Sequence, residues 1–226
     1  MKLILVRHGE SIWNKENKFT GWTDVDLSAK GITEARVIGQ KLKANNYTFD
    51  IAYTSVLIRA IHTLDYILEA MNLNIPIVRN YKLNERHYGA LQGLNKDETS
   101  KKYGEDQVKL WRRSVGVRPP SLTIEDKRYP GYDLKYQALD RQELPLTESL
   151  EDTIKRVVEY YQDEILPSLK ADKDVIVVAH GNSLRGLIKY LENMSDEEVV
   201  NLEIKTGSAY IYELNNNLDI MDKKII

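Results

Sequence analysis

The run DVIVVA at residues 174–179, directly followed by His180 and Gly181, is the clearest indication of the fold in this sequence. An unbroken apolar run rich in β-branched side chains indicates a strand that is buried on both faces. Strands of this kind belong to mostly parallel sheets that carry helices on both sides. The His-Gly turn therefore places a histidine at the end of a buried strand.

A second stretch of the same kind opens the chain, where a short apolar run ends in Arg7-His8-Gly9. Between the two runs, apolar stripes at helical spacing alternate with further short apolar segments. The strands that we expect are Lys2–Val6, Asp50–Thr54, Ile75–Val78, Asp174–Ala179 and Ala209–Leu214, the last with an edge position as one option. The helices that we expect are Gly31–Lys43, Ile58–Met71, Asn95–Arg113, Thr147–Leu169 and Ser183–Asn193.

This alternation of strands and helices predicts an α/β fold. We expect a three-layer sandwich, a mostly parallel sheet with helices on both faces, in a single domain of 226 residues. The segment from about residue 95 to 144 departs from the pattern, because it is first polar and then rich in proline, glycine and tyrosine without sustained periodicity. We interpret it as an insertion that covers a pocket on the main body.

The composition excludes several classes of protein. Because the chain has no cysteine, it cannot use thiolate catalysis, disulfides or cysteine-ligated metals. Its net charge of −2 shows no basic excess, which argues against nucleic acid as a partner. No run approaches the ~18 apolar residues of a membrane span. The opening apolar run is also too short for a signal peptide. We therefore expect a cytoplasmic protein with no membrane partner.

Polar side chains that suit phosphate chemistry follow four of the expected strands. His8 and His180 end the two buried strands, Arg59 follows the second strand, and Glu85 follows the third with Arg86 beside it. Ligands of parallel α/β sheets bind beyond the carboxyl ends of the strands. Two of only four histidines in the chain thus occupy matching positions at the edge where a site is expected.

These residue types are the ones that a phosphohistidine mechanism needs. The attacking imidazole must be neutral, with its tautomer fixed by a hydrogen bond to the other nitrogen. A glycine directly after the histidine lets the chain turn sharply. Arginines bind phosphate in a bidentate manner, and a carboxyl group moves the proton of the alcohol. The sequence therefore predicts phosphoryl transfer through His8.

Each of these residues also has a purely structural interpretation. A lone histidine at a strand end is more often structural, and Glu85 alone could simply pair with Arg86. Arg112 and Arg113 could form a solvated helix end, and as neighbours on a helix they could both reach a ligand only near its terminus. His62 is expected to be structural. The combination of two His-Gly turns with arginines at strand ends favours the functional interpretation.

Several blocks of the chain resemble a known family. The run Arg7-His8-Gly9-Glu10-Ser11-Ile12-Trp13-Asn14 resembles the signature of the histidine phosphatase superfamily. More narrowly, the chain is similar to the cofactor-dependent phosphoglycerate mutases. The other blocks that carry this likeness are Phe19–Asp24, Thr54–Thr63, Leu83–Gly89, Leu91–Lys96, Trp111–Arg113 and His180–Arg185.

The resemblance implies a role for each matching position. His8 would carry the phosphoryl group, Glu85 would donate and accept the proton, and His180 would stabilise the group in transfer. Arg7 and Arg59 would hold the transferring phosphate. The substrate-binding residues that the resemblance implies are Arg7, His8, Gly9, Glu10, Ser11, Ile12, Trp13, Asn14, Thr20, Gly21, Arg59, Glu85, Arg86, His87, Tyr88, Lys96, Arg112, Arg113, Gly181 and Asn182.

The resemblance also implies a reaction. It would interconvert 3-phosphoglycerate and 2-phosphoglycerate, in glycolysis and gluconeogenesis, with 2,3-bisphosphoglycerate as the priming phosphoryl donor and no metal. Relatives of this kind commonly form homodimers or homotetramers. Many of them carry a longer mobile tail over the pocket, whereas here we expect only a short tail after residue 214. If water entered, the phosphohistidine would hydrolyse.

Other functions remain open on the sequence alone. The nearest alternative is a small-molecule phosphatase that uses His8 and passes the phosphoryl group to water. Bisphosphoglycerate synthase or phosphatase activities would share the same residues. A non-catalytic anion-binding module would not require both His8 and Glu85. A metallo-hydrolase on His8, His87 and His180 is disfavoured, because no acidic partners at metal-ligand spacing are evident.

Overall fold

A six-stranded mixed sheet forms the centre of the molecule in the computed structural model, which describes residues 1–226. The strand order is β3-β2-β4-β1-β5-β6. The first four of these are parallel, whereas β5 and β6 run antiparallel to their neighbours. The bounds are β1 (Lys2–Arg7), β2 (Ile51–Thr54), β3 (Ile77–Arg79), β4 (Val175–Ala179), β5 (Ala209–Leu214) and β6 (Ile220–Ile225).

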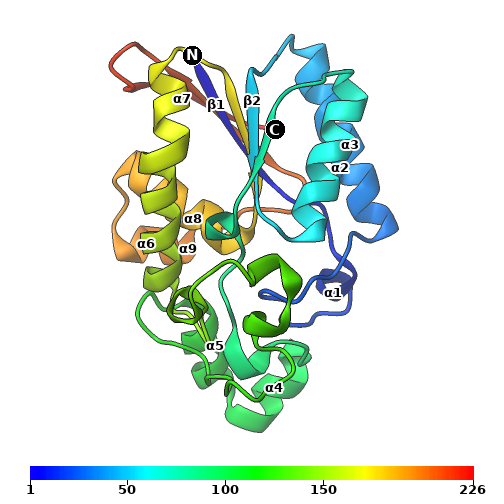
Figure 1. The fold of residues 1–226 in the computed structure, drawn as a ribbon, viewed down its shortest axis with the longest axis vertical. Coiled ribbons are helices and arrows are strands. Elements are labelled where there is room, and N and C mark those ends of the chain that lie inside the picture. The colour runs from blue at the N-terminus through cyan, green and yellow to red at the C-terminus, as the bar shows by residue number, and fades with distance from the viewer.

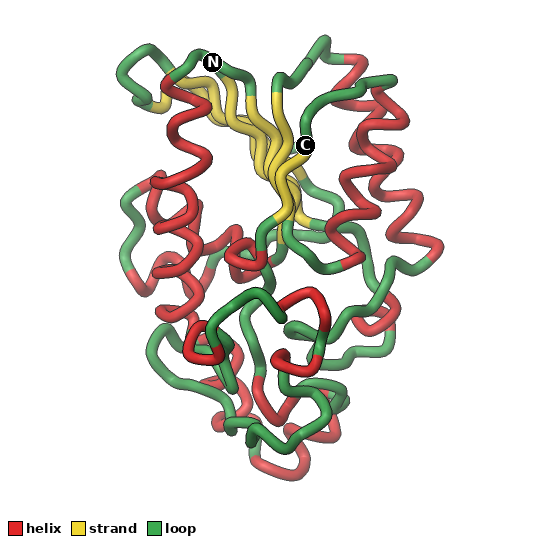
Figure 2. The backbone as a smooth tube through the Cα atoms, viewed as in Figure 1, coloured by secondary structure: helices red, strands yellow, loops and turns green.

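Helices cover both faces of this sheet, and the three layers are seen from the side in Figure 1. The long helices α6 and α8 lie on one face, and α2 and α3 lie on the other, while Figure 2 shows the strands as one layer between them. The helices are α1 (Ile12–Lys15), α2 (Ala29–Ala44), α3 (Ile58–Met71), α4 (Lys96–Tyr103), α5 (Glu105–Arg113), α6 (Leu150–Tyr160), α7 (Leu166–Lys170), α8 (Gly181–Glu192) and α9 (Asp196–Asn201).

The unbroken apolar strands are buried because each supplies side chains to two cores. On β1, Leu3 and Leu5 pack with the helices of one face, while Ile4 and Val6 pack with those of the other. The same alternation holds along β4, whose five residues are all fully buried. The prediction of a three-layer α/β sandwich is therefore confirmed. None of the helices is long and apolar enough to cross a membrane.

The expected element boundaries needed several corrections. The helix expected over residues 95–113 is two helices, because Gly104 breaks it with a φ of 88°. The helix expected over residues 147–169 begins at Leu150, after the capping residue Ser149, and passes through a π-helical segment at Tyr161–Ile165. The third strand lies two residues later than expected at its start.

The C-terminal part of the sheet differs most from the expectation. Strand β5 is not at an edge but lies between β1 and β6. The residues expected to form a short tail are instead β6, which pairs with β5. Strand β6 is largely exposed. Its sequence, IMDKKI, has neither the apolar run nor the alternation of apolar and polar residues that indicates a strand.

The segment of residues 95–144 lies beyond the carboxyl ends of the parallel strands, as the green part of the chain in Figure 1 shows. Two small cores attach it to the main body. Val108 packs with Phe19 and Leu91, and Tyr129 and Tyr136 pack in a second core, against Trp22. The segment thus forms one wall of the region in which the sequence places a site.

Candidate active site

His8 and His180 lie side by side at the carboxyl ends of the two central strands. Strands β1 and β4 are neighbours in register, with Arg7 opposite Ala179, so the residues that follow them meet. The backbone N–H of His8 donates to the carbonyl of Ala179 (3.0 Å), and the two imidazole centroids are 4.9 Å apart. Both histidines are buried, with exposed fractions of 2% and 0%.

The surroundings of His8 favour a neutral nucleophile. Nδ1 lies 2.6 Å from the carbonyl oxygen of Gly9, so Nδ1 carries the hydrogen and the lone pair of Nε2 is free. Burial holds the pKa of His8 well below its usual range, and the nearby charges of Arg59 and Arg7 lower it further. A neutral imidazole with an available Nε2 is the form that can attack phosphorus.

His180 is neutral for the same physical reasons. Burial, followed by the charge of Arg59 and the neighbouring His8, holds its pKa well below the usual value. Its Nε2 lies 2.8 Å from the hydroxyl of Ser55, at the end of β2. The two imidazoles therefore belong to one buried polar cluster at the ends of strands β1, β2 and β4, of which His8 lines the cavity and His180 does not.

Two arginines next to His8 are bound by backbone carbonyls and not by carboxylates. The guanidinium of Arg7 donates to Ile204 O (2.5 Å), and that of Arg59 donates to Gly21 O (2.8 Å) and Thr23 O (3.0 Å). Burial lowers the pKa of Arg59 to about 10 and also lowers that of Arg7. A buried cation without a carboxylate partner is costly, and an anionic ligand would offset that cost.

Glu85 faces this centre from the loop that follows β3. Its Oε1 accepts hydrogen bonds from the backbone N–H groups of Arg86 (2.7 Å) and Asn182 (3.1 Å). Asn182 lies in the first turn of α8, so the carboxylate is joined to the helix that His180 precedes. The carboxyl group is 8% exposed as a residue and lines the same cavity as the two arginines.

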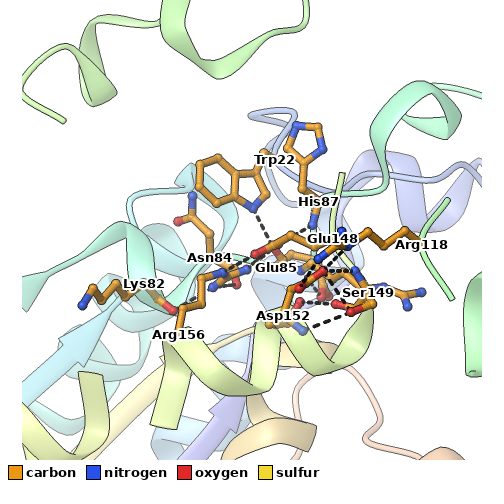
Figure 3. A network of polar contacts seen from close by, with 12 residues as sticks. Trp22, Lys82, Asn84, Glu85, His87, Arg118, Glu148, Ser149, Asp152 and Arg156 are labelled. Carbon is orange, nitrogen blue, oxygen red and sulfur yellow. Dashed lines mark hydrogen bonds and ion pairs between the residues drawn. The ribbon is translucent and has the colours of Figure 1, made fainter. Parts of the chain in front are cut away.

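The loop that carries Glu85 is held by an ion pair between Arg156 of α6 and Glu148, which precedes that helix, as Figure 3 shows. Arg156 pairs with Glu148 through two hydrogen bonds (2.7 and 2.9 Å). The same guanidinium donates to the carbonyls of Lys82, Asn84 and Glu85 at 2.7, 2.9 and 2.9 Å. The Trp22 indole N–H also donates to Glu85 O (2.6 Å). The backbone of Glu85 is therefore fixed from two sides.

His8, Glu85 and the two arginines Arg7 and Arg59 line one cavity of about 550 Å³. Its walls come from the strand ends, from the inserted segment and from the chain that leads into β5. The residues of the predicted site that line it are Arg7, His8, Asn14, Thr20, Gly21, Arg59, Glu85, Tyr88, Lys96, Arg112, Arg113, Gly181 and Asn182. The residues of the predicted site that do not line it are Gly9, Glu10, Ser11, Ile12, Trp13, Arg86, His87 and, among the catalytic set, His180.

Arg86 does not line the cavity. Its guanidinium is fully buried and donates to the carbonyls of Trp111 (2.6 Å) and Arg112 (3.2 Å) at the end of α5. His87 is also buried, accepts from the Gly89 N–H (3.0 Å), and has its pKa lowered to about 3 by burial and by nearby arginines. Both side chains thus support the walls of the cavity.

The other positions that do not line the cavity shape the turn after β1. A β carbon at Gly9 would collide with the carbonyl of Gly31, so only glycine allows this close approach to α2. The side chain of Glu10 accepts a hydrogen bond from Ser28, and Ser11 caps α1. Ile12 is exposed, and Trp13 lies against Gly93.

Several lining residues had no signal of their own in the sequence. They come from the loop after α1, from α2, from α8 and from the chain before β5, and most are isolated charges. These residues are Lys18, Phe19, Lys30, Glu34, Arg185, Glu203, Ile204, Lys205 and Thr206. Phe19 and Arg185 lie within blocks that carry the family resemblance, which is the only sequence feature that could have suggested them. No group of three or more His, Cys, Asp or Glu side chains is arranged to hold a metal ion.

An α/β sheet with a neutral histidine and unpaired arginines at its strand ends defines an enzyme of phosphoryl transfer. The chain belongs to the histidine phosphatase superfamily (branch 1), whose family model matches residues 3–127 and 123–222.

Solved structures with the same fold cover nearly the whole chain. Mycobacterial glucosyl-3-phosphoglycerate phosphatase has a TM-score of 0.69 at 20% identity, over 99% of this chain and 96% of that one. Alpha-ribazole phosphatase from Shigella flexneri has 0.69 at 21%, over 98% and 95%. Phosphoserine phosphatase from Entamoeba histolytica, in complex with 3-phosphoglyceric acid, has 0.65 at 24%, over 94% and 90%. At these identities the likeness establishes the shared fold.

Proposed function

We propose that the protein is a 2,3-bisphosphoglycerate-dependent phosphoglycerate mutase. The observation that carries the proposal is a second group of cations in the cavity that contains His8. Lys96, Arg112 and Arg113, from α4 and α5, line it together with Arg7 and Arg59. A phosphomonoester carries roughly −1.5 to −2 at neutral pH, and a glycerate adds one carboxylate. A substrate with two anionic groups suits a cavity that holds this many cations.

The chain's own residues supply the steps of such a transfer. Nε2 of His8 attacks phosphorus, and the bond from phosphorus to the alcohol oxygen breaks. Glu85 gives its proton to that leaving oxygen, and takes a proton from the hydroxyl that later accepts the phosphoryl group. Arg7 and Arg59 bind the equatorial oxygens as charge builds on them. Bound 2,3-bisphosphoglycerate would supply the priming phosphoryl group, and its two phosphates suit the two groups of cations.

A phosphatase with the same nucleophile is the second candidate. The names of the structural relatives favour it, since the three described above are all phosphatases. One of them was solved with 3-phosphoglyceric acid bound. In that case water would take the phosphoryl group from His8, with Glu85 as the base. The two candidate activities would use the same residues around His8. They differ in the acceptor of the phosphoryl group, which is a substrate hydroxyl in the mutase and water in the phosphatase.

One assay separates the two candidates. Purified protein is incubated with 3-phosphoglycerate, with and without a trace of 2,3-bisphosphoglycerate, and the products are followed by ³¹P NMR. The mutase gives 2-phosphoglycerate, at a rate that rises with the bisphosphate, and little free phosphate. If inorganic phosphate is released as fast as the substrate is lost, the mutase proposal is wrong and the protein is a phosphatase. Inhibition by EDTA would contradict both, because neither uses a metal.

A further inference from the structure

Arg185 is a cation of the cavity that neither the phosphohistidine centre nor the predicted binding residues account for. It lies on α8, one turn after Gly181, and is partly buried. Its Nε donates to the carbonyl of Leu202 (2.7 Å), and its Nη1 donates to the side-chain oxygen of Asn182 (3.1 Å). It forms no ion pair with a carboxylate, and Nη2 makes no hydrogen bond within the protein.

The surroundings of Arg185 are unfavourable for a cation unless an anion is present. Burial lowers its pKa to about 10, and the charge of Arg113 lowers it in the same direction. Asn182 links the guanidinium to the other side of the cavity, since its amide N–H₂ donates to the Tyr88 hydroxyl (3.2 Å). A guanidinium that is held by two acceptors and keeps one nitrogen free is oriented for an anionic oxygen.

Glu203 supplies a carboxylate that pairs with Arg113. The two groups form an ion pair at 3.7 Å, between the end of α5 and the chain that leads into β5. The Glu203 side chain is 76% exposed, so this pair is weakly held. Both residues line the cavity. An anionic ligand that reached Arg113 would therefore compete with a carboxylate already in place.

We propose that Arg185 and Glu203 together determine which anions this side of the cavity accepts. Arg185 donates hydrogen bonds to the anionic group of the substrate that is not transferred. Glu203 pairs with Arg113 until that anionic group displaces the Glu203 carboxylate. The inference rests on the proposed function, because it requires a substrate with two anionic ends. It predicts that Arg185 distinguishes such a substrate from a lone phosphate, which needs only Arg7 and Arg59.

The test measures binding by titration calorimetry with two probes, 3-phosphoglycerate and inorganic phosphate. Arg185→Gln removes a charge-assisted hydrogen bond and should weaken 3-phosphoglycerate about tenfold or more, with phosphate affinity unchanged. Glu203→Gln should tighten 3-phosphoglycerate by roughly two- to fivefold, as loss of an exposed ion pair predicts. Lys189→Gln is the matched control, because it removes a cation from α8 outside the cavity and should change neither affinity.

Each other outcome overturns a definite statement. If Arg185→Gln weakens both probes equally, or neither, the inference is wrong. If Glu203→Gln weakens 3-phosphoglycerate, its role as a competing carboxylate is wrong. If the wild-type protein binds 3-phosphoglycerate no more tightly than phosphate, the proposed function fails and the inference fails with it. Should Arg185→Gln not fold, Arg185→Lys keeps the charge without the planar fork and should lose part of the preference for 3-phosphoglycerate.

Discussion

Among single residues, His8 is the one on which the proposed phosphoryl transfer depends. We predict that His8→Ala abolishes acid-labile phosphate labelling from 2,3-bisphosphoglycerate, since His8 lines the cavity with its Nε2 free, whereas His180 does not line it and its Nε2 is held by Ser55. The measurement is incorporation of radiolabel, with loss of label in acid. The control is His62→Ala, because His62 pairs with Asp26 outside the cavity and its loss should leave labelling intact. Full labelling of His8→Ala would remove the mechanism.

The proposed role of Glu85 is proton transfer, which a substitution can separate from substrate binding. Glu85→Gln keeps a side-chain oxygen that can accept from the N–H groups of Arg86 and Asn182, but it cannot donate a proton as the acid does. We predict a fall in kcat of roughly 10²- to 10⁴-fold, with little change in the affinity for 3-phosphoglycerate. Steady-state kinetics and calorimetry on the same preparation measure the two quantities. An unchanged kcat would show that another group moves the proton.

The residues of the centre could be predicted because local pattern and topology agreed. His8 and His180 directly follow apolar strands, Arg7 ends β1, and Arg59 lies in the first turn of α3 after β2. Parallel strands bring these ends together. Arg185 could not be predicted in this way, because a single charge on a helix indicates nothing until the helix is placed. Arg86 lies beside Glu85 in the sequence, yet its guanidinium turns to the end of α5. Adjacency in sequence does not fix the direction of a side chain.

Among the elements, α6 holds the loop between β3 and α4 in place through hydrogen bonds from Arg156. Arg156 and Glu148 are nearly buried, with side-chain exposures of 13% and 5%. The guanidinium of Arg156 also donates a hydrogen bond to the backbone carbonyl of Glu85. We predict that Arg156→Met lowers the free energy of unfolding by about 3–5 kcal/mol, because it leaves a buried carboxylate unpaired. It should also lower kcat, because Glu85 loses one of the donors to its carbonyl. Urea unfolding and kinetics measure the two effects.

Arg118 offers a matched control for this prediction. It forms a two-point ion pair with Asp152 near the start of the same helix, but its side chain is 61% exposed. Arg118→Gln should therefore cost less than about 1 kcal/mol and leave kcat unchanged. If both variants lost the same stability, the buried pair would not be what holds the loop. If Arg156→Met lost stability but kept full kcat, the Arg156–Glu148 pair would stabilise the fold without positioning Glu85 for catalysis.

The predictability of the elements follows their burial. Strands β1 and β4 are apolar on both faces, which makes the run visible in the sequence. Strand β6 is polar and exposed, and it is a strand only because β5 offers it a partner. The sequence does not predict the break at Gly104, because a single glycine inside a polar helical pattern is weak evidence of a boundary.

In the molecule as a whole, an excess of positively charged side chains lines the cavity. The chain has a net charge of −2, yet nine Lys and Arg side chains line the cavity together with only three Glu. This local excess could not be read from the composition, because the cations come from segments spread from residue 7 to residue 205. Oligomeric state and the role of residues 95–144 as a cover for the pocket stay predictions.

The buried histidines couple the site to the stability of the whole fold. Burial lowers the pKa of His8 and His180 well below the ordinary value, and that of His87 to about 3. In the unfolded chain these groups titrate near ~6.5. Below that pH the unfolded state binds more protons than the native state, so stability falls as the pH decreases. Above it, none of the three histidines contributes a pH dependence.

We therefore predict that the free energy of unfolding decreases between pH 7 and pH 5, by up to roughly 1.4 kcal/mol per pH unit for each buried histidine. Urea unfolding at several pH values measures the slope. Asp126 and Asp152, whose pKa values are about 2, contribute only at lower pH. In His87→Asn, the side-chain oxygen can replace Nδ1 as the acceptor for the Gly89 N–H, and the slope should fall by one histidine's share. A slope unchanged by that variant would mean that other groups titrate, and that His87 is not held neutral by burial.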